Sequence, residues 1–486
     1  MNLTSSINPI LAALFGLTLF SLGFFNDSIS FKFLIFSTFV SIGIFLLSIP
    51  MNWAIYILFF YLGIEGFAKM MTQYHPIIHV GADILIVTLW IRILITQIIQ
   101  RKGLPTTYPP LTFLFFIHFL WFTVTLANPY SLSLFASLAG AKLYLTIVSL
   151  FFFGYYLSSD LKTVESFMTP WLMICVLQVA TSLYQAAIGP SSVLSLSPTY
   201  AFALKKFEGY AFRPFGLTSQ AGGPSVFLYL CTPFMVYFLF YSRSLLTKLA
   251  IPLLLFTSTL TVFVCQVRSS LLKTILGGAG VFFFATRNLQ TLSQKTRKGT
   301  FLAIGIATIG IILIGPYWID KILDANPDNQ RAFDRSLSLF EYKNVSQARS
   351  GALDRFLKYT ELVPLGAGLS RMGSASGKFQ ELIAANHYFS NTFFSDNLWI
   401  ELLVDLGLPG LIIFTLILIS IIIKAFMGFL KIQNPEFKAV QWTLICALGA
   451  ILIGAYGAEP ILYNPEGAFF WFFSGVALRI PTLDQV

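Results

Sequence analysis

The chain alternates between long apolar segments and short polar loops, and this pattern predicts its main elements. A helix that crosses a bilayer needs about 20 mostly apolar residues, because its backbone amides must all be satisfied within the helix itself. Runs bounded by Pro, Gly, Asn or charged residues give about fourteen candidate spans: residues 9–25, 31–48, 53–71, 77–99, 111–127, 138–157, 168–188, 223–241, 249–267, 270–286, 300–318, 397–424, 440–458 and 466–480. We therefore expect an all-α polytopic membrane protein with about 14 transmembrane helices (12–14).

One polar segment interrupts this pattern. Residues 319–396 form a large loop between the eleventh and twelfth predicted spans, which divides the chain into residues 1–318, 319–396 and 397–486. Within the loop, residues 346–362 have the periodicity of an amphipathic helix, which Pro364 and the glycines after it end. A loop of this length without a disorder-like composition is usually functional.

The composition excludes several classes of protein. Of the 486 residues, 56% are hydrophobic and 11% are charged, whereas soluble domains carry about 25% charged residues. A soluble enzyme and a disordered chain are therefore excluded. The apolar runs are also unbroken, unlike the alternating segments of about ten residues in a transmembrane β-barrel. The four cysteines all lie in apolar stretches, so we expect neither a disulfide framework nor a zinc cluster.

The charge distribution predicts the orientation. Because short cytoplasmic loops carry an excess of Lys and Arg, the 286–299 loop, which contains four basic residues, is predicted to be cytoplasmic. Alternation of the spans then places both termini in the cytoplasm and the 189–222 and 319–396 loops outside. Basic and acidic residues balance within the large loop, so the net charge of +10 lies elsewhere. It indicates membrane lipids as partners rather than a nucleic acid.

Four polar clusters lie on the predicted outer side, where charged residues need water, a partner or a ligand. They are Arg213-Pro-Phe-Gly216, Arg268 with Lys273, Arg349 with Arg355, and His387 followed by Asp396 and Glu401. Arginines from separate segments suit a diphosphate, because each guanidinium group binds phosphate oxygens bidentately and stays charged. Asp396 or His387 could accept the proton of an attacking hydroxyl group.

Each candidate also has a plainer interpretation. Arginines at span ends commonly extend to lipid headgroups. Asp396, directly after Ser395, suits the N-cap of the following helix, and His387 suits a solvated loop. Glu459 and Glu466 fall on the outer side and could line the same cavity.

Other ionisable residues carry weaker signals. His75, His79 and Asp83 are spaced four residues apart, which on one helix face would suit a metal ion. Pro76 moves His75 out of helical geometry, so we predict no metal site. His118 and Lys142 lie in or beside spans, with no assigned role. No nucleotide-binding motif appears, so we expect no cofactor and an activated substrate as the source of energy.

The outer clusters, in this order, resemble motifs of the O-antigen ligase and polysaccharide polymerase family of bacterial inner-membrane glycosyltransferases. Arg213-Pro-Phe-Gly216 resembles the family's Arg-x-x-Gly segment, and Arg268-Ser-Ser-Leu271 resembles its Ser-Arg-Gly/Ser-Ala-Leu turn, with Val267 in place of Ser.

The second half of the resemblance lies in the large loop and after it. Arg349, with Leu353 in place of Trp, and Pro364-Leu-Gly-Ala-Gly368 are similar to an Arg-x-x-x-Trp…Pro-x-x-Gly-x-Gly stretch, with a spacing one residue shorter. Asp396-Asn397 with Gly407 and Gly410 resembles a His-Asn…Gly-x-x-Gly entry into a late span. The similarity covers roughly residues 205–415.

The resemblance implies an architecture similar to the membrane glycosyltransferases of C type and a metal-independent enzyme in the bacterial cytoplasmic membrane. Its donor would be a polyprenyl-pyrophosphate-linked glycan, held by Arg213, Arg268, Arg349 and Arg355, and its acceptor a second glycan. Other envelope polysaccharide assembly proteins are implied as partners. Asp at position 396, where ligases carry His, favours a polymerase over a ligase.

Two other classes stay open. Related sequences have been labelled bicarbonate transporters, and a small-solute transporter would have discontinuous helices with ionisable residues near the middle of the bilayer. A scaffold subunit of an envelope-assembly complex would carry the outer arginines only incidentally.

Overall fold

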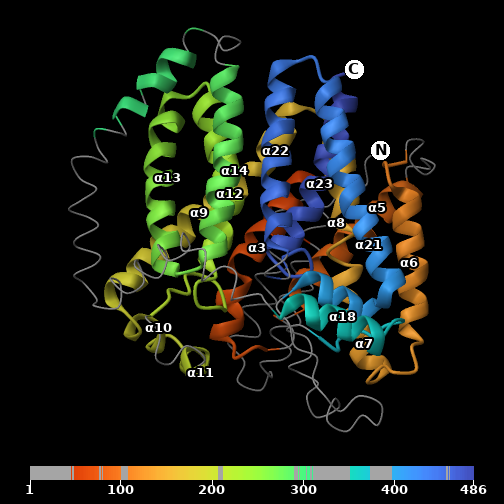
Figure 1. Cartoon of the computed structure of the whole chain (residues 1–486). Helices are drawn as coiled ribbons and strands as arrows, with labels where there is room; N and C mark the ends of the chain where they lie inside the picture. Colours follow the sequence, from red (N-terminus) through yellow and green to blue (C-terminus); the bar gives the residue numbers. More distant parts are fainter. Residues whose placement is uncertain are drawn as a thin grey trace.

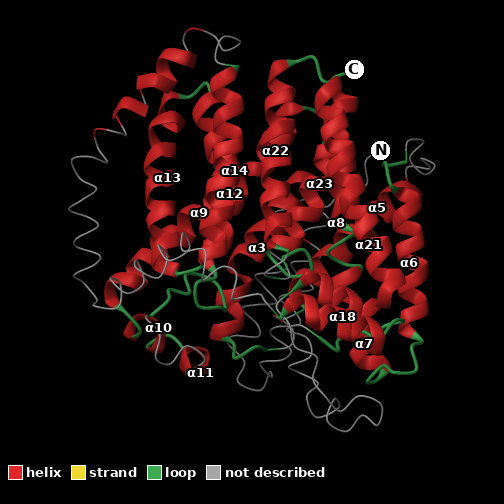
Figure 2. Ribbon diagram, viewed as in Figure 1, coloured by secondary structure: helices red, strands yellow, loops and turns green. Residues whose placement is uncertain are grey.

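The structure of the protein is a computed structural model. This structure describes residues 45, 49–75, 78, 80–99, 108–205, 212–288, 294, 296–302, 304–306, 309, 351–372, 397–455, 458 and 460–485. Within these ranges every regular element is an α-helix (Figure 2). The all-α prediction is therefore confirmed for the described part of the chain.

The helices stand side by side and run mainly along one direction (Figure 1). They are α3 (Met51–Met71), α5 (Gly81–Ile99), α6 (Thr112–Leu126), α7 (Leu134–Tyr144), α8 (Leu150–Leu157), α9 (Leu161–Ile188), α10 (Ser191–Leu194), α11 (Thr199–Lys205), α12 (Pro224–Tyr241), α13 (Leu245–Cys265), α14 (Arg268–Arg287), α18 (Ala352–Leu362), α21 (Leu398–Lys431), α22 (Pro435–Gly454) and α23 (Glu466–Leu483).

By length and composition, seven of the described helices could cross a membrane: α3, α9, α12, α13, α14, α21 and α22. This supports the prediction of a polytopic membrane protein. Candidate spans 9–25, 31–48 and 300–318 lie wholly or largely outside the described residues, as does most of the 319–396 loop. The count of fourteen spans therefore stays a prediction.

The candidate span over residues 138–157 is not one continuous helix. The chain forms α7 and α8 instead, separated by turns at residues 145–149. Ser149 lies at this break, where its hydroxyl donates to the Thr146 carbonyl (2.7 Å) and accepts from the Trp90 indole N–H (2.9 Å). Such side-chain bonds offer the backbone an alternative to the helical ladder.

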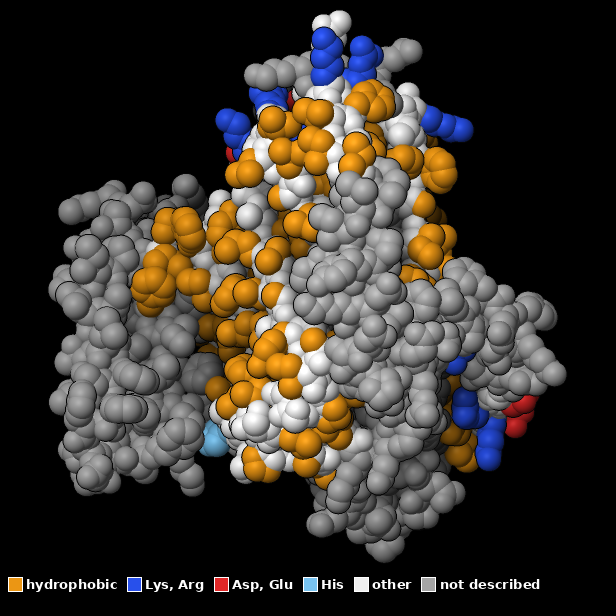
Figure 3. Space-filling model, turned by 90° about the vertical axis from the view of Figure 1, so that its left-hand side faces the viewer, with side chains coloured by type: hydrophobic (Ala, Val, Ile, Leu, Met, Phe, Trp, Pro, Cys, Tyr) orange, Lys and Arg blue, Asp and Glu red, His pale blue; other side chains and the backbone are white. Residues whose placement is uncertain are grey.

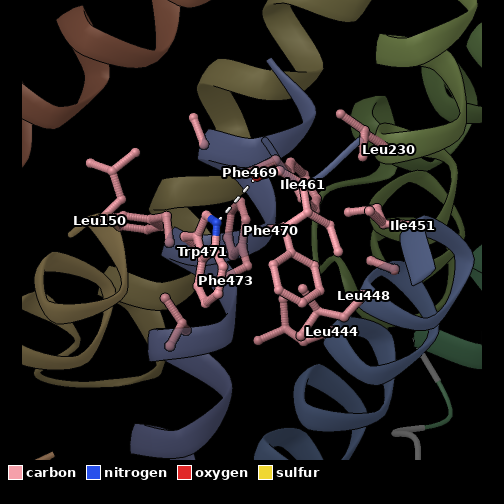
Figure 4. Close-up of a cluster of buried hydrophobic side chains, with 14 of the residues drawn as sticks. Leu150, Leu230, Leu444, Leu448, Ile451, Ile461, Phe469, Phe470, Trp471 and Phe473 are labelled. Atoms are coloured by element: carbon pink, nitrogen blue, oxygen red, sulfur yellow. Dashed lines mark hydrogen bonds between the residues drawn. The ribbon is translucent and has the colours of Figure 1, made fainter. Parts of the chain in front are cut away.

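The core surrounds α23, which is buried on nearly all sides from Gly467 to Ile480. Two glycines allow α8 and α23 to touch: a Cβ atom at Gly154 would lie 1.9 Å from the Phe472 carbonyl oxygen, and one at Gly475 would lie 1.9 Å from that of Phe151. Such small residues let transmembrane helices approach closely. Figure 4 shows the aromatic side chains of α23 packed against apolar residues of neighbouring helices, with the Trp471 indole donating to the Ile461 carbonyl (3.2 Å).

The two ends of the bundle differ in charge. Arg243, in the loop between α12 and α13, pairs with Glu436 at the start of α22 (3.2 Å). Arg287 ends α14 and Lys431 ends α21 at this same end. In the face seen in Figure 3, Lys and Arg side chains gather at the upper end, above a broad hydrophobic surface. Basic residues of the described short loops thus gather at one end, and the side of the membrane that this end faces stays a prediction.

Candidate functional site at the loop end

The opposite end of the bundle, the lower end in Figure 1, is where α12 and α14 begin. We call it the loop end. A two-residue turn, Gln266 and Val267, separates the end of α13 from the start of α14. Near it, the Ser225 hydroxyl in the first turn of α12 donates to the Ser270 hydroxyl in the first turn of α14 (3.0 Å). Two helix N-termini, each with a partial positive charge, therefore lie close together.

Two buried glutamines of α9 hold the Arg213-Pro-Phe-Gly216 segment. The Gln185 Oε1 atom accepts hydrogen bonds from the backbone N–H groups of Phe215 and Gly216 (both 2.8 Å), and its Nε2 donates to the Gly216 carbonyl (3.1 Å). Gln178 accepts from the Leu217 N–H (2.9 Å). Gly216 has φ = +53°, and a Cβ atom there would lie 2.5 Å from Gln178 Oε1. The position therefore requires glycine.

The same segment contacts the turn before Arg268. Gln266 Nε2 donates to the Phe212 carbonyl (3.1 Å). Gly222 donates to the Pro214 carbonyl (2.8 Å), and a Cβ atom at Gly222 would lie 2.8 Å from Val267 Cγ2. The segments that carry Arg213 and Arg268 are thus joined, and both arginines are half-buried.

Lys273 lies further along α14 and is paired. Its Nζ atom lies 3.3 Å from the Glu466 carboxylate and 4.2 Å from the centre of the Tyr229 ring, and the Tyr229 hydroxyl donates to the same carboxylate. Gly454 provides the space, since a Cβ atom there would meet Lys273 Nζ at 2.4 Å. Glu466, which could line the same cavity as the outer clusters by its position in the sequence, lies beside Lys273 and pairs with it.

A second polar region lies where α21 is interrupted. Gly407 has φ = +72°, and the helix continues in a new direction after it. The Leu408 N–H donates to the Pro364 carbonyl (2.8 Å), and the Ala367 N–H donates to the Val404 carbonyl (2.6 Å). A Cβ atom at Gly407 would lie 2.4 Å from the carbonyl carbon of Leu365. The Pro364–Gly368 segment and the Gly407–Gly410 segment are thus packed directly on each other.

Two buried carboxylates of α21 connect this region to other helices. Asp405 accepts from the Tyr144 hydroxyl (3.0 Å) and from the Arg371 backbone N–H (3.2 Å). Glu401, one turn earlier, accepts from the Tyr463 hydroxyl (2.6 Å). Burial lowers the pKa of the Arg371 guanidinium, and the nearby Asp405 carboxylate opposes this shift.

The start of α21 corrects one interpretation. Asn397 is the N-cap, and its side-chain oxygen accepts from the backbone N–H groups of Trp399 (2.9 Å) and Ile400 (3.3 Å). The alternative that Asp396 caps this helix is therefore wrong. Asn accepts hydrogen bonds from the free N–H groups of a first helical turn as well as Asp does. The residue types of Asp396 and Asn397 therefore could not show which of the two is the N-cap.

The remaining predicted site residues are only partly placed. Asp396, His387 and Arg349 lie outside the described residues. Arg355 lies on α18 and is exposed, on a helix that packs against α21. The described structure thus joins the segments of Arg213 and Arg268 and leaves Arg355 on a different helix.

The weaker candidates have structural partners or lie outside the described residues. Asp83 pairs with Lys142 (3.5 Å). His118 is buried, and its Nε2 atom lies 3.3 Å from the Tyr144 carbonyl oxygen. His79 and Glu459 lie outside the described residues. No group of three or more potential metal ligands occurs among the residues that the structure describes.

Gln178 and Gln185 were missed by sequence reasoning. The sequence carries a weak sign of their role, because two glutamines seven residues apart occupy one face of an otherwise apolar helix.

No protein-family model matches the chain, and no curated protein matches it either.

Proposed function

We propose that this protein is a polysaccharide polymerase of a bacterial cytoplasmic membrane, with the loop end on the outer face. It transfers a glycan from a polyprenyl pyrophosphate to a hydroxyl group of a second, acceptor glycan. The lipid tail of the donor lies between the spans, and its diphosphate lies against Arg213 and Arg268.

One observation carries this proposal: the segments of Arg213 and Arg268 are joined at the beginnings of α12 and α14. Two half-buried guanidinium groups beside two helix N-termini form a strongly anion-attracting region, and such termini commonly bind phosphate. Lys273 is excluded as a third phosphate ligand, because it is buried and paired with Glu466. Arg349 and Arg355 of the large loop are kept in the proposal as further ligands of the diphosphate.

The acceptor hydroxyl oxygen attacks the anomeric carbon of the donor, the bond from that carbon to the pyrophosphate oxygen breaks, and the hydroxyl proton goes to Asp396 or His387. Negative charge builds on the leaving diphosphate, where the arginines stabilise it. Such placed charges usually lower a barrier more than activation of the nucleophile does.

Reconstitution of the purified protein with a lipid-linked repeat unit tests this proposal. A polymerase gives a ladder of products, whereas a ligase gives a single transfer and only when its own acceptor is supplied. Absence of any transfer with several lipid-linked repeat units and acceptors would reject the glycosyltransferase proposal.

A specific observation favours a second candidate, a small-solute transporter. α21 is discontinuous at Gly407, and the buried carboxylates of Glu401 and Asp405 lie just before the break. Discontinuous helices with ionisable groups are typical of ion and solute sites in transporters, and those sites lie near the bilayer midplane. This candidate therefore requires Glu401 and Asp405 to lie deeper in the membrane than the polymerase proposal does. Uptake of bicarbonate or of a labelled sugar into liposomes that contain the protein, abolished by Asp405→Asn, would favour this candidate.

A further inference from the structure

Helix α18 has three distinct sides. Ala352, Phe356 and Tyr359 face the protein, and the last two pack against the buried cluster that contains Ile400 and Val404 of α21. The charged residues occupy a second side and are exposed: Asp354, Arg355, Lys358 and Glu361. A helix that packs against a protein on one side and faces water on the others normally has only an apolar buried side and a polar exposed side.

The third side is apolar, and the residues that the structure describes leave it largely exposed. Leu353 and Leu357, four residues apart and thus on one face, are 63% and 54% exposed. Leu362, which lies beside Lys358 in the last turn, and Leu365, just after the helix, are also largely exposed (49% and 62%). Four largely exposed leucines within one short stretch are unusual for a surface that faces water.

Two contacts of α18 indicate the depth at which it lies relative to the membrane. Ile400 and Val404 belong to the part of α21 before Gly407. The part after it, Leu408–Lys431, is about 35 Å long, enough to cross the hydrocarbon core of about 30 Å alone. α18 therefore lies beside the segment at the edge of the membrane, not beside the span.

The second contact involves α6, an apolar helix with large exposed side chains such as Phe116 and Val124. Asn128, two residues beyond the end of α6, donates to the Gly366 carbonyl (3.0 Å). The chain that follows α18 thus lies where α6 leaves the bundle. The exposed leucines continue, at the membrane edge, a surface that is already lipid-facing in composition.

We infer that α18 is an interfacial helix that lies in the headgroup layer at the loop end, with Leu353 and Leu357 inserted at the boundary with the lipid acyl chains. Its polar side carries two basic and two acidic residues, which balance. Burial of leucine surface, at about 25 cal/mol per Å², therefore holds it there rather than attraction to anionic lipid. This assignment does not depend on which reaction the protein catalyses.

Spin labels on two neighbouring positions test this inference. Leu357→Cys and Lys358→Cys are labelled with a nitroxide in the full chain and reconstituted in vesicles of phosphatidylcholine, with or without phosphatidylglycerol. The parent chain gives the background from Cys446, and Phe116→Cys on α6 gives a lipid-facing reference. Collisions with oxygen, which concentrates in lipid, are compared with collisions with a water-soluble nickel chelate.

We expect oxygen collisions to dominate at position 357, as at position 116, and nickel collisions to dominate at position 358, with the same result in both lipid compositions. Equal nickel access at positions 357 and 358 would overturn the inference, because both sides of the helix would then face water. Low access to both reagents at position 357, with dipolar broadening between labels, would also overturn it and indicate a second copy of the chain as the occupant. Leu353→Cys repeats the measurement if Leu357→Cys does not fold.

Discussion

At the residue scale, the backbone around Arg213 is held by side chains that are distant in sequence. Arg213 and Gly216 could be selected from their pattern, because an arginine before a glycine turn is visible locally. Gln178 and Gln185 could not, since a glutamine in an apolar helix shows its role only when its partners are in place. The capping role of Asn397 was missed for a similar reason: two adjacent residues were both good caps.

Replacing Gln185 with Leu should therefore destabilise the loop end. The change removes one acceptor and one donor from buried backbone groups of Phe215 and Gly216, and each buried polar group left unsatisfied costs about 1–3 kcal/mol. We expect a lower unfolding temperature in detergent. Gln220→Leu, at an exposed position of the same loop, is the matched control, and equal stability of the two variants would contradict the proposed role of Gln185.

Asp160 should make stability depend on pH at the start of α9. Its carboxylate accepts the Thr163 backbone N–H (2.8 Å), and this bond lowers the pKa of Asp160 from its usual value of 3.8. Because the folded pKa is the lower one, the stabilisation is present above pH 3.8 and is lost as the pH falls through the folded pKa.

Asp160→Ala should remove the cap at neutral pH, at a cost of about 1 kcal/mol, and Asp160→Asn should largely keep it. The difference in unfolding temperature between the original chain and Asp160→Ala should shrink as the pH is lowered below 3.8. A difference that stays constant with pH would show that the charged cap contributes nothing.

At the element scale, the apolar runs predicted most helices that the structure describes, because length and hydrophobicity are local properties. The break between α7 and α8 and the kink at Gly407 were not predicted. Both depend on partners from far along the chain, such as the Trp90 indole at Ser149 and the Pro364 carbonyl at Leu408. An apolar run alone does not reveal where its helix is interrupted.

The contact between α8 and α23 should be highly sensitive to size. A Cβ atom at Gly475 would lie 1.9 Å from the Phe151 carbonyl oxygen and 2.7 Å from the Tyr155 nitrogen, so Gly475→Ala must separate the two helices. Overpacking of this kind costs about 1–3 kcal/mol, and the measurement is thermal unfolding in detergent.

Gly449→Ala on α22 is the matched control, because nothing lies within 4 Å of a Cβ atom there. It should be neutral or stabilise the helix by about 0.5–1 kcal/mol, since Gly is the poorer helix former. Similar unfolding temperatures for Gly475→Ala and Gly449→Ala would show that α8 and α23 are less closely packed than described.

At the scale of the whole molecule, the two ends of the bundle have different chemistry. Short-loop basic residues such as Arg243 and Arg287 lie at one end, and the candidate site lies at the other. The sequence could predict this division, because positive charges in short loops are distributed by topology. It could not predict which outer arginines lie together, since that depends on how α9, α12 and α14 pack.

The orientation can be tested by thiol labelling in intact cells with a membrane-impermeant maleimide. Gln220→Cys, at the loop end, should be labelled from outside, and Lys431→Cys should be labelled only after the membrane is permeabilised. The parent chain, with its three buried cysteines and half-buried Cys446, sets the background. Labelling of Lys431→Cys alone in intact cells would reverse the orientation and remove the proposed site from the outer face.

The central claim is that Arg213 and Arg268 hold a lipid-linked diphosphate. It is tested most directly by comparing Arg268→Ala with Arg287→Ala, at the opposite end of the same helix α14, in cells that make the polymer and at equal protein levels. We predict that Arg268→Ala accumulates lipid-linked repeat units and loses long polymer, and that Arg287→Ala keeps the normal length distribution. Normal polymer length in Arg268→Ala would contradict the account.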